Sequence, residues 1–293
     1  MLIIGCGDIA RRTIRLLRKN YHLYALIRNG MQRDGLRTQG AFPIMGDLDH
    51  RKSLSRISGL ADIVLHLAPP PNSGVKDVRT GHLLAALSKG SLPRQFIYIS
   101  TSGVYGDCKD AWVSETYTVH PQSARAQRRV DAESQIRHWA RKNGVKASIL
   151  RVPGIYAEDR LPLERLRTGM PAIAADEDSY TNHIHADDLA RIIVAALHRG
   201  RPNRVYHASD DGAMKMGDYF DIVADAYYLP RPQRISRAEA QRAIPESMLS
   251  FMNESRRLTN SRIKQELQVR LNYPTVGNAL ADWAREAPAC IPS

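Results

Sequence analysis

Short, nearly continuous apolar runs alternate along the first half of the chain with longer stretches in which apolar residues recur at helical spacing. A run of the first kind fits a strand that is buried on both faces of a parallel sheet. The pattern predicts strands at 1–4, 22–27, 41–45, 62–68, 95–100 and 146–152, and helices at 9–19, 31–38, 54–60, 75–89 and 123–142. Such alternation is typical of an α/β fold with a doubly wound parallel sheet, whose ligands bind at the carboxyl ends of the strands.

The turn after the first strand has the sequence Gly5-Cys6-Gly7-Asp8-Ile9-Ala10, of the form G-x-G-x-x-A. Gly5 allows a tight turn, Gly7 lets the backbone approach a pyrophosphate, and Ala10 is small enough for the helix to pack close to the strand. Backbone N–H groups and the dipole at the start of the helix can then bind phosphates. We therefore expect Gly5, Cys6, Gly7, Asp8 and Ile9 to bind a dinucleotide in a Rossmann-type core.

The residue at the end of the second predicted strand is Arg28, followed by Asn29. An acidic residue here would hydrogen-bond the ribose hydroxyls of NAD and repel a 2′-phosphate, whereas a basic residue accommodates the phosphate of NADP. The sequence therefore favours NADP over NAD. The alternative is an ordinary exposed arginine at the end of a strand.

The regular alternation breaks beyond Pro153, where Pro, Gly and charged residues separate short elements. These are predicted as strands at 182–184 and 204–207 and helices at 186–198 and 215–228, followed by a mixed, partly helical region. We expect residues 1–152 to form the dinucleotide-binding core and residues 153–293 to form a small substrate-binding lobe. No linker separates the two, so the lobe is expected to interleave with the core.

The chain has 293 residues and a formal net charge of +12, from 42 Lys and Arg against 30 Asp and Glu. A basic surface can bind nucleic acid. Here the excess is spread along the chain, without a basic tail or an aromatic-interleaved stripe. We therefore expect attraction for an anionic cofactor and a small-molecule substrate, and no nucleic-acid partner.

No stretch approaches the roughly 20 apolar residues of a membrane span, and no charged and apolar leader precedes the glycine motif. The three cysteines Cys6, Cys108 and Cys290 form no C-x-x-C pair. Neither a disulfide framework nor a zinc site is indicated. The sequence predicts a cytoplasmic protein without a membrane partner.

The sequence resembles the extended short-chain dehydrogenase/reductase superfamily, the group of nucleotide-sugar epimerases and dehydratases. The resemblance covers nearly the whole chain and rests on six motifs in order: the glycine motif, Gly46-Asp47-Leu48, His66-Leu67-Ala68, Ser100-Thr101-x-x-Val104-Tyr105-Gly106, Arg151-x-Pro153-Gly154-Ile155-Tyr156 and His185-Ala186-Asp187-Asp188-Leu189-Ala190. It implies that Asp47 and Leu48 lie near the adenine, that Leu67, Ala68 and Pro69 line the cofactor cleft, that Thr101 is the active-site hydroxyl, and that Pro153 lies beside the nicotinamide.

The catalytic centre departs from this superfamily, which carries a Tyr and, four residues later, a Lys in a helix introduced by P-x-S. Pro121-x-Ser123 is present, but Arg125 stands at the Tyr position and Arg129 at the Lys position. Arginine stays protonated at working pH and cannot take up or return a proton as that Tyr does. Because residues four apart share a helix face, Arg125 and Arg129 are predicted to hold a phosphate or carboxylate. The alternative is a solvated basic face.

Other groups near the predicted cleft are candidates for proton transfer: Thr101, Tyr105, Tyr117 and His120. By the resemblance, Tyr105, Tyr156, Arg160, Asn182 and His183 are candidate substrate contacts. His183 and His185 share a face of a predicted strand, but without a third convergent ligand no metal site is indicated. We expect His185 instead to order the turn before the helix that Asp187 and Asp188 open.

These observations favour an atypical NADP-binding oxidoreductase or epimerase-like enzyme with a small anionic or nucleotide-linked substrate. The competing interpretation is a non-catalytic protein that holds NADP as a redox sensor or regulatory partner. The missing Tyr and Lys favour the second, and the retained residues around Thr101 and Pro153 favour the first. The resemblance also implies a homodimer that pairs through the helices after Pro70 and Pro121.

Overall fold

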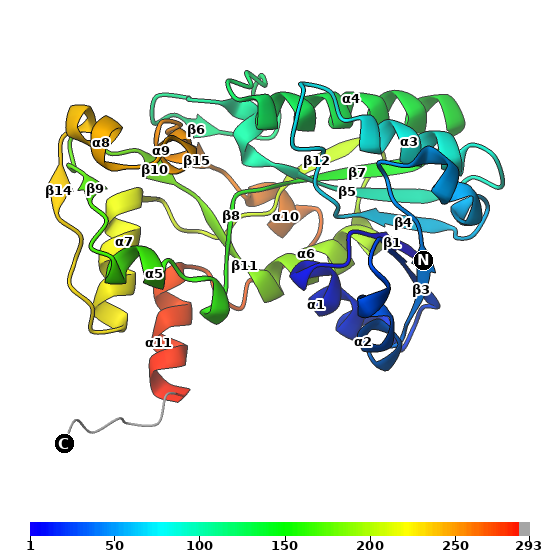
Figure 1. Ribbon diagram of the computed structural model, residues 1–293, viewed down its shortest axis with the longest axis horizontal. Coiled ribbons are helices and arrows are strands. Elements are labelled where there is room, and N and C mark those ends of the chain that lie inside the picture. The colour runs from blue at the N-terminus through cyan, green and yellow to red at the C-terminus, as the bar shows by residue number, and fades with distance from the viewer. Residues whose placement is uncertain (287–293) are drawn as a thin grey trace.

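Seven parallel strands form the central sheet of the computed structural model, which describes residues 1–286 (Figure 1). The strand order is β12-β7-β5-β4-β1-β2-β3, and every neighbouring pair is parallel. The strands are β1 Leu2–Ile4, β2 Leu23–Ile27, β3 Ala41–Met45, β4 Ile63–His66, β5 Gln95–Thr101, β7 Lys146–Val152 and β12 Arg204–His207. The predicted doubly wound α/β fold is confirmed.

Alternate residues of each strand face opposite sides of the sheet, because successive side chains of a strand point to opposite faces. Leu2 and Ile4 pack into one apolar cluster and Ile3 into the other. Helices α3 (Val78–Leu87) and α4 (Ala124–Asn143) cover the first face, and α1 (Asp8–Leu17) and α6 (Ala186–Arg199) cover the second (Figure 1). The continuous apolar runs in the sequence reflect this burial on both faces.

Capping side chains set the ends of several helices. The side chain of Ser123 accepts a hydrogen bond from the N–H of Ala126 and begins α4, which ends at Gly144 in a left-handed conformation. The helix predicted at 75–89 begins only at Val78, because Asp77 caps it by accepting from the N–H of Thr80. The segment predicted as a helix at 54–60 is a 3-10 helix, η2, at Arg51–Ile57. Helix α2 spans Arg33–Thr38.

Residues beyond Pro153 contribute to the central core as well as to the smaller lobe. Strand β12 pairs with β7 at the edge of the sheet, and α6 packs against α1 through Ile193 and Leu189. The His185 ring accepts a hydrogen bond at Nδ1 from the N–H of Asp187 and so caps α6, as expected from the sequence. The core and the lobe are therefore interleaved along the chain.

The smaller lobe combines short helices with two-residue and three-residue strands. Its apolar cluster includes Tyr156, Phe220 and Leu280. Its helices are α5 Leu163–Arg167, α7 Met216–Ala226, α8 Arg237–Ala243, α9 Glu246–Met252 and α11 Val276–Glu286, and η4 spans Glu158–Arg160. Helix α10 (Ser261–Gln265) instead packs against β12 and contributes Ile263 to the central core. The strand pairs are β8 Gly154–Tyr156 with β11 His183–His185, β9 Ala172–Ile173 with β14 Arg234–Ile235, β10 Tyr180–Thr181 with β13 Met214–Lys215, and β6 Trp112–Val113 with β15 Arg257–Leu258.

None of the helices within residues 1–286 is long and apolar enough to cross a membrane. Cys6 and Cys108 are free and buried, and Cys290 lies outside the described residues.

Candidate cofactor and substrate site

The glycine turn joins β1 to α1 at the point where the strand order of the sheet reverses. Gly5 has φ +92°, and a Cβ at this position would lie 2.5 Å from the backbone nitrogen of Ala68. Gly7 is the residue before α1, and a Cβ there would meet nothing within 4 Å. Gly5 thus permits close packing against the end of β4, whereas Gly7 leaves its backbone open to a ligand.

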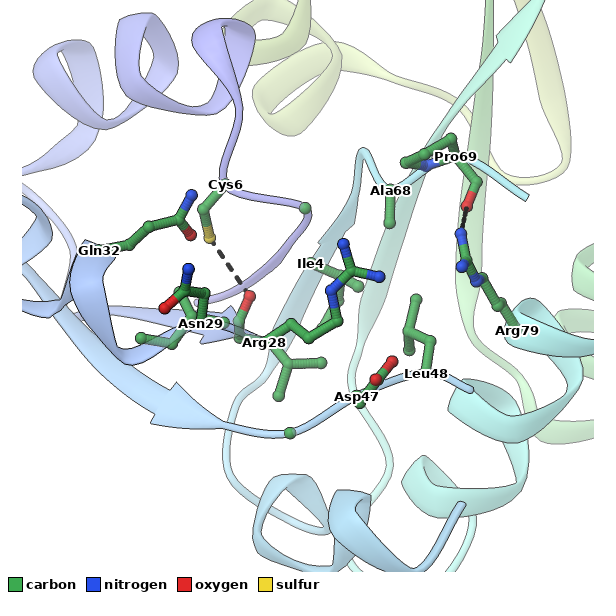
Figure 2. A pocket seen from close by; sticks show the side chains of 14 residues that line it. Ile4, Cys6, Arg28, Asn29, Gln32, Asp47, Leu48, Ala68, Pro69 and Arg79 are labelled. Atoms are coloured by element: carbon green, nitrogen blue, oxygen red, sulfur yellow. Dashed lines mark hydrogen bonds between the residues drawn. The ribbon is translucent and has the colours of Figure 1, made fainter. Parts of the chain in front are cut away.

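A cavity of about 350 Å³ lies between the glycine turn and the carboxyl ends of β2, β3 and β4 (Figure 2). It collects predicted cofactor residues from four separate segments: Gly5, Cys6, Arg28, Asp47, Leu48, Ala68 and Pro69. The Cys6 thiol donates to the carbonyl oxygen of Leu26 at 3.4 Å, and burial raises its pKa to about 12. Cys6 therefore packs as a neutral thiol in the wall of the cavity.

Arg28 extends its guanidinium into this cavity from the end of β2 (Figure 2). Within residues 1–286 it makes no hydrogen bond or ion pair. An unpaired guanidinium keeps its donors available for a bidentate contact with a phosphate. This free group is the strongest sign of ligand preference in the cavity.

Arg79 reaches the same cavity from α3 but is already engaged. Its Nε and Nη2 each donate to a carboxylate oxygen of Asp49 at 2.7 Å, and its Nη1 donates to the carbonyl oxygens of Pro69 and Pro70. The hydrogen bonds from Arg79 lower the pKa of Asp49. Arg79 thereby fixes the loop after β4, and the sequence alone gave no signal for this role.

The other predicted cofactor residues do not line this cavity in the described structure. Asp8 and Ile9 begin α1 directly after Gly7. Leu67 packs against the apolar cluster under the sheet, and Pro153 lines a second cavity.

The second cavity, of about 310 Å³, lies where β5 and β7 end against the smaller lobe. It brings together Thr101 and Arg125 from the core with Pro153, Tyr156, Asn182 and His183 from the residues beyond 152. The Thr101 hydroxyl accepts from the N–H of Gly103 at 3.2 Å. Six of the predicted catalytic, cofactor and substrate residues therefore meet in one place.

Arg125 and Arg129 have different surroundings, and Arg129 is not among the described residues that line this cavity. The guanidinium of Arg125 lies 3.9 Å from the centre of the Phe251 ring. Arg129 donates from Nη1 to the Tyr98 hydroxyl at 3.0 Å and to the carbonyl oxygen of Ile99 at 2.7 Å. The structure thus does not bring both guanidinium groups to this cavity, and an anion site shared by Arg125 and Arg129 stays a prediction.

Three residues from the C-terminal region complete the second cavity: Phe251, Glu254 and Arg256. Arg256 donates from Nη1 to Glu254 at 3.0 Å and to the carbonyl oxygen of Gly106 at 2.8 Å, and both side chains are largely buried. Glu254 is the only carboxylate among the described residues that line the cavity. Partial burial lowers the pKa of Arg125, and the charge of Glu254 opposes that shift.

A buried polar network supports the floor of this region. Arg151 donates to both carboxylate oxygens of Glu133, at 3.0 and 2.7 Å, and Glu133 accepts from the hydroxyl of Ser100 at 2.6 Å. Arg151 also donates to the Tyr105 hydroxyl, which lies 2.5 Å from Nε2 of His207. Burial raises the pKa of Tyr105 to about 12.

Tyr105 is therefore a structural residue and does not contact the second cavity, contrary to its predicted role in substrate binding. Tyr117 is 44% exposed and its ring makes an edge contact with the ring of Tyr105, and His120 is also exposed. The structure brings neither to the cavity. Arg160 lies against Asp8 at the start of α1, also away from the predicted substrate contacts.

The remaining predicted substrate residues line the cavity but are tightly packed. Asn182 bonds the backbone of Arg256 and Leu258 through its amide group. The His183 ring stacks 4.2 Å from Tyr219, and burial lowers its pKa to about 4. Within residues 1–286, no group of three or more His, Cys, Asp or Glu side chains is placed to hold a metal ion.

A family model for the NAD-dependent epimerase/dehydratase family matches residues 1–209. The chain belongs to this family. A dTDP-glucose 4,6-dehydratase from Mycobacterium tuberculosis is 26% identical over 191 residues, which cover 58% of this chain and 57% of the relative. The match thus spans little more than half the length of that dehydratase.

Solved structures of similar fold extend the likeness over nearly the whole chain. A conserved protein of unknown function from Silicibacter pomeroyi is 28% identical, with a TM-score of 0.80 and 98% of each chain covered. A dTDP-glucose 4,6-dehydratase from Streptomyces venezuelae, solved with NAD bound, is 19% identical, with a TM-score of 0.78 and coverage of 97% of this chain and 95% of that one. At 19% identity this second likeness shows the fold alone.

The first cavity fits the dinucleotide that this family uses. Gly5 and Gly7 provide a close-packed turn with open backbone at the start of a helix, and no side chain caps α1 in the described structure. The apolar side chains of Ile4, Leu48 and Ala68 offer a surface for a planar base. When bound there, such a cofactor supplies hydride chemistry at its nicotinamide.

Proposed function

We propose that this member of the NAD-dependent epimerase/dehydratase family binds NADP in the first cavity. The observation that carries this proposal is the unpaired guanidinium of Arg28 inside the cavity, at the end of β2. A 2′-phosphate would gain a charge-assisted, bidentate contact there. Arg79 is held by Asp49, so Arg28 would provide the guanidinium that is free to bind the phosphate, although the carboxylate of Asp47 lines the same cavity.

We further propose that the chain is an oxidoreductase or epimerase-like enzyme for a small anionic or nucleotide-linked substrate. Among the described residues that line the second cavity, Arg125 and Arg256 provide two guanidinium groups and Glu254 provides one carboxylate. This balance favours a ligand that carries a carboxylate or phosphate. The Thr101 hydroxyl would orient a substrate oxygen.

Proton transfer in the proposed reaction would need a group other than Arg125, because a guanidinium does not give up its proton at working pH. Glu254 is a carboxylate within the cavity and could accept the proton of a substrate hydroxyl. When bound, the cofactor would supply the hydride acceptor for the same carbon. Glu254 would take the proton and Thr101 would hold the oxygen of the substrate hydroxyl as it becomes a carbonyl, and in a reduction Glu254 would return that proton.

A second candidate function is non-catalytic binding of NADP by a sensor or regulatory protein. It is favoured by Arg125 at the position of the superfamily's Tyr and by the engagement of Arg129 with β5. In this reading the second cavity would bind an effector, and no turnover would occur.

Calorimetric titrations with NADPH and NADH, on the wild type and on Arg28→Asp, test the cofactor proposal. We expect the wild type to prefer NADPH and the variant to prefer NADH. A wild type that binds NADH more tightly would refute the preference, and binding of neither nucleotide would refute the cofactor role.

Oxidation of NADPH by a panel of carbonyl compounds and nucleotide sugars tests catalysis. The Glu254→Gln variant should lose activity if Glu254 transfers the proton. The Arg125→Tyr/Arg129→Lys double variant separates the two candidates: activity that appears only in this variant favours the non-catalytic function for the natural chain.

A further inference from the structure

The first turn of α1 carries a carboxylate at the helix end that the diphosphate of a dinucleotide must approach. Asp8 is the first residue of α1, directly after the open backbone of Gly7. Two negative charges brought to this end would be repelled by Asp8 although the helix dipole attracts them. The structure shows how that carboxylate is neutralised.

Arg12 and Arg160 both contact Asp8 but differ in how firmly they are held. Arg12 donates to Asp8 at 2.9 and 3.1 Å and to Asp187 at 2.6 Å, and it lies 3.8 Å from Asp159. Its side chain is 18% exposed. Arg12 is thus fixed by three carboxylates.

Arg160 is held loosely by comparison. It ends η4 in the loop that follows β8, so it reaches Asp8 from the smaller lobe. The one hydrogen bond of its side chain within residues 1–286 is the 3.4 Å contact from Nη1 to Asp8, and this side chain is 38% exposed. An exposed ion pair of this kind is worth little by itself.

We propose that Arg160 binds the diphosphate of the dinucleotide, exchanging its contact with Asp8 for one with the phosphate oxygens. This inference rests on the proposed cofactor site. A guanidinium with most of its donors free, beside the helix end that receives phosphates, can make a bidentate contact there. Arg12 remains to neutralise Asp8 after the exchange.

The exchange gives the smaller lobe a direct contact with the cofactor. Arg160 lies between β8, which lines the second cavity, and α5 of the lobe. Binding of the dinucleotide would therefore draw this loop toward the glycine turn. Arg160, which the sequence predicted as a substrate contact, is thus proposed to contact the cofactor.

Titration calorimetry with two probes tests the proposal on the full chain. NADPH carries the diphosphate, whereas adenosine 2′-monophosphate carries the 2′-phosphate without it. Arg160→Ala should weaken NADPH about tenfold, the order of one lost charge-assisted hydrogen bond, and leave adenosine 2′-monophosphate unchanged. Arg28→Ala should weaken both probes.

The background variant Asp8→Asn separates contact from charge compensation. If Arg160 only neutralised Asp8, Arg160→Ala would not change the affinity for NADPH in this background. If Arg160 contacts the diphosphate, Arg160→Ala should still lower the affinity for NADPH about tenfold. Arg167→Ala, on the exposed end of α5, removes the same charge nearby and should leave NADPH binding unchanged. Circular dichroism of each variant checks that it is folded.

The outcomes distinguish this inference from the function on which it rests. Equal NADPH affinity of Arg160→Ala and Arg167→Ala, or a loss that vanishes in Asp8→Asn, would overturn the role of Arg160 alone. A wild type that does not bind NADPH would overturn the cofactor proposal and the role of Arg160 together.

Discussion

Alanine at Gly5 should destabilise the fold strongly, whereas alanine at Gly7 should affect ligand binding with little effect on stability. At Gly5 the φ of +92° is strained for any residue with a Cβ, which costs roughly 1–3 kcal/mol. The new Cβ would also lie 2.5 Å from the nitrogen and 2.7 Å from the Cα of Ala68, both backbone atoms that can move only with β4. Such overpacking adds roughly 1–3 kcal/mol.

The combined loss for Gly5→Ala is therefore roughly 2–6 kcal/mol in the free energy of unfolding. At Gly7 the backbone has φ −79°, which alanine adopts freely, and a Cβ there would point into open space. Its cost should stay below about 1 kcal/mol, the scale of an altered helix cap. The same methyl group would nevertheless obstruct a diphosphate at the start of α1.

Urea unfolding followed by circular dichroism measures both stabilities, and calorimetry measures NADPH binding to each variant. The reasoning would be refuted if Gly5→Ala unfolded within 0.5 kcal/mol of the wild type, a margin of about the size that separates ordinary surface substitutions. Gly7→Ala with unchanged NADPH affinity would refute the argument for close backbone approach.

Three further predictions concern the buried network, pH dependence and assembly. Glu133→Gln leaves the charge of Arg151 buried without its full partner and should cost about 3–5 kcal/mol in urea unfolding; a loss below 1 kcal/mol would contradict the pairing. Burial raises the pKa of Asp210 to about 8, so the folded state keeps a proton that the unfolded chain releases near pH 4. The free energy of unfolding should therefore fall as pH rises from about 4 to about 8. Asp210→Asn removes this proton equilibrium, so its stability relative to the wild type should rise by at most about 1.4 kcal/mol per pH unit in that range. Equal pH dependence of the two unfolding free energies would contradict this. Size-exclusion chromatography with light scattering should show a dimer, and a monomer would remove that prediction.

The parallel sheet could be predicted from sequence because burial on both faces leaves continuous apolar runs. Strands β1, β5 and β7 are of this kind, and the glycine motif marks where β1 is followed by a helix. Helix boundaries were less predictable, because a single capping side chain can fix where a helix begins. Asp77 caps α3, so this helix begins at Val78 and not at the predicted residue 75.

The residues of the candidate site likewise differ in how predictable they were from the sequence. Arg28, Asp47 and Thr101 follow strands, so their convergence at one edge of the sheet could be foreseen. Glu254 and Arg256 line the second cavity from a segment next to the two-residue strand β15. A strand this short shows no alternation of apolar and polar residues, so the sequence could not place these side chains. Arg125 and Arg129 both lie in α4, as predicted. Their spacing could not reveal that Arg129 would donate to the Tyr98 hydroxyl and to the carbonyl oxygen of Ile99.

The place of β12 and α6 in the central core has a consequence for how the chain folds during synthesis. Residues 1–152 include six of the seven strands, yet the apolar face of α1 is covered by α6, which begins at Ala186. Until that helix leaves the ribosome, Ile14 and Leu17 lack the part of their apolar cluster that α6 provides. We expect the nascent core to remain loosely packed and dependent on chaperones until about 200 residues have emerged, and a fragment ending at residue 152 to aggregate.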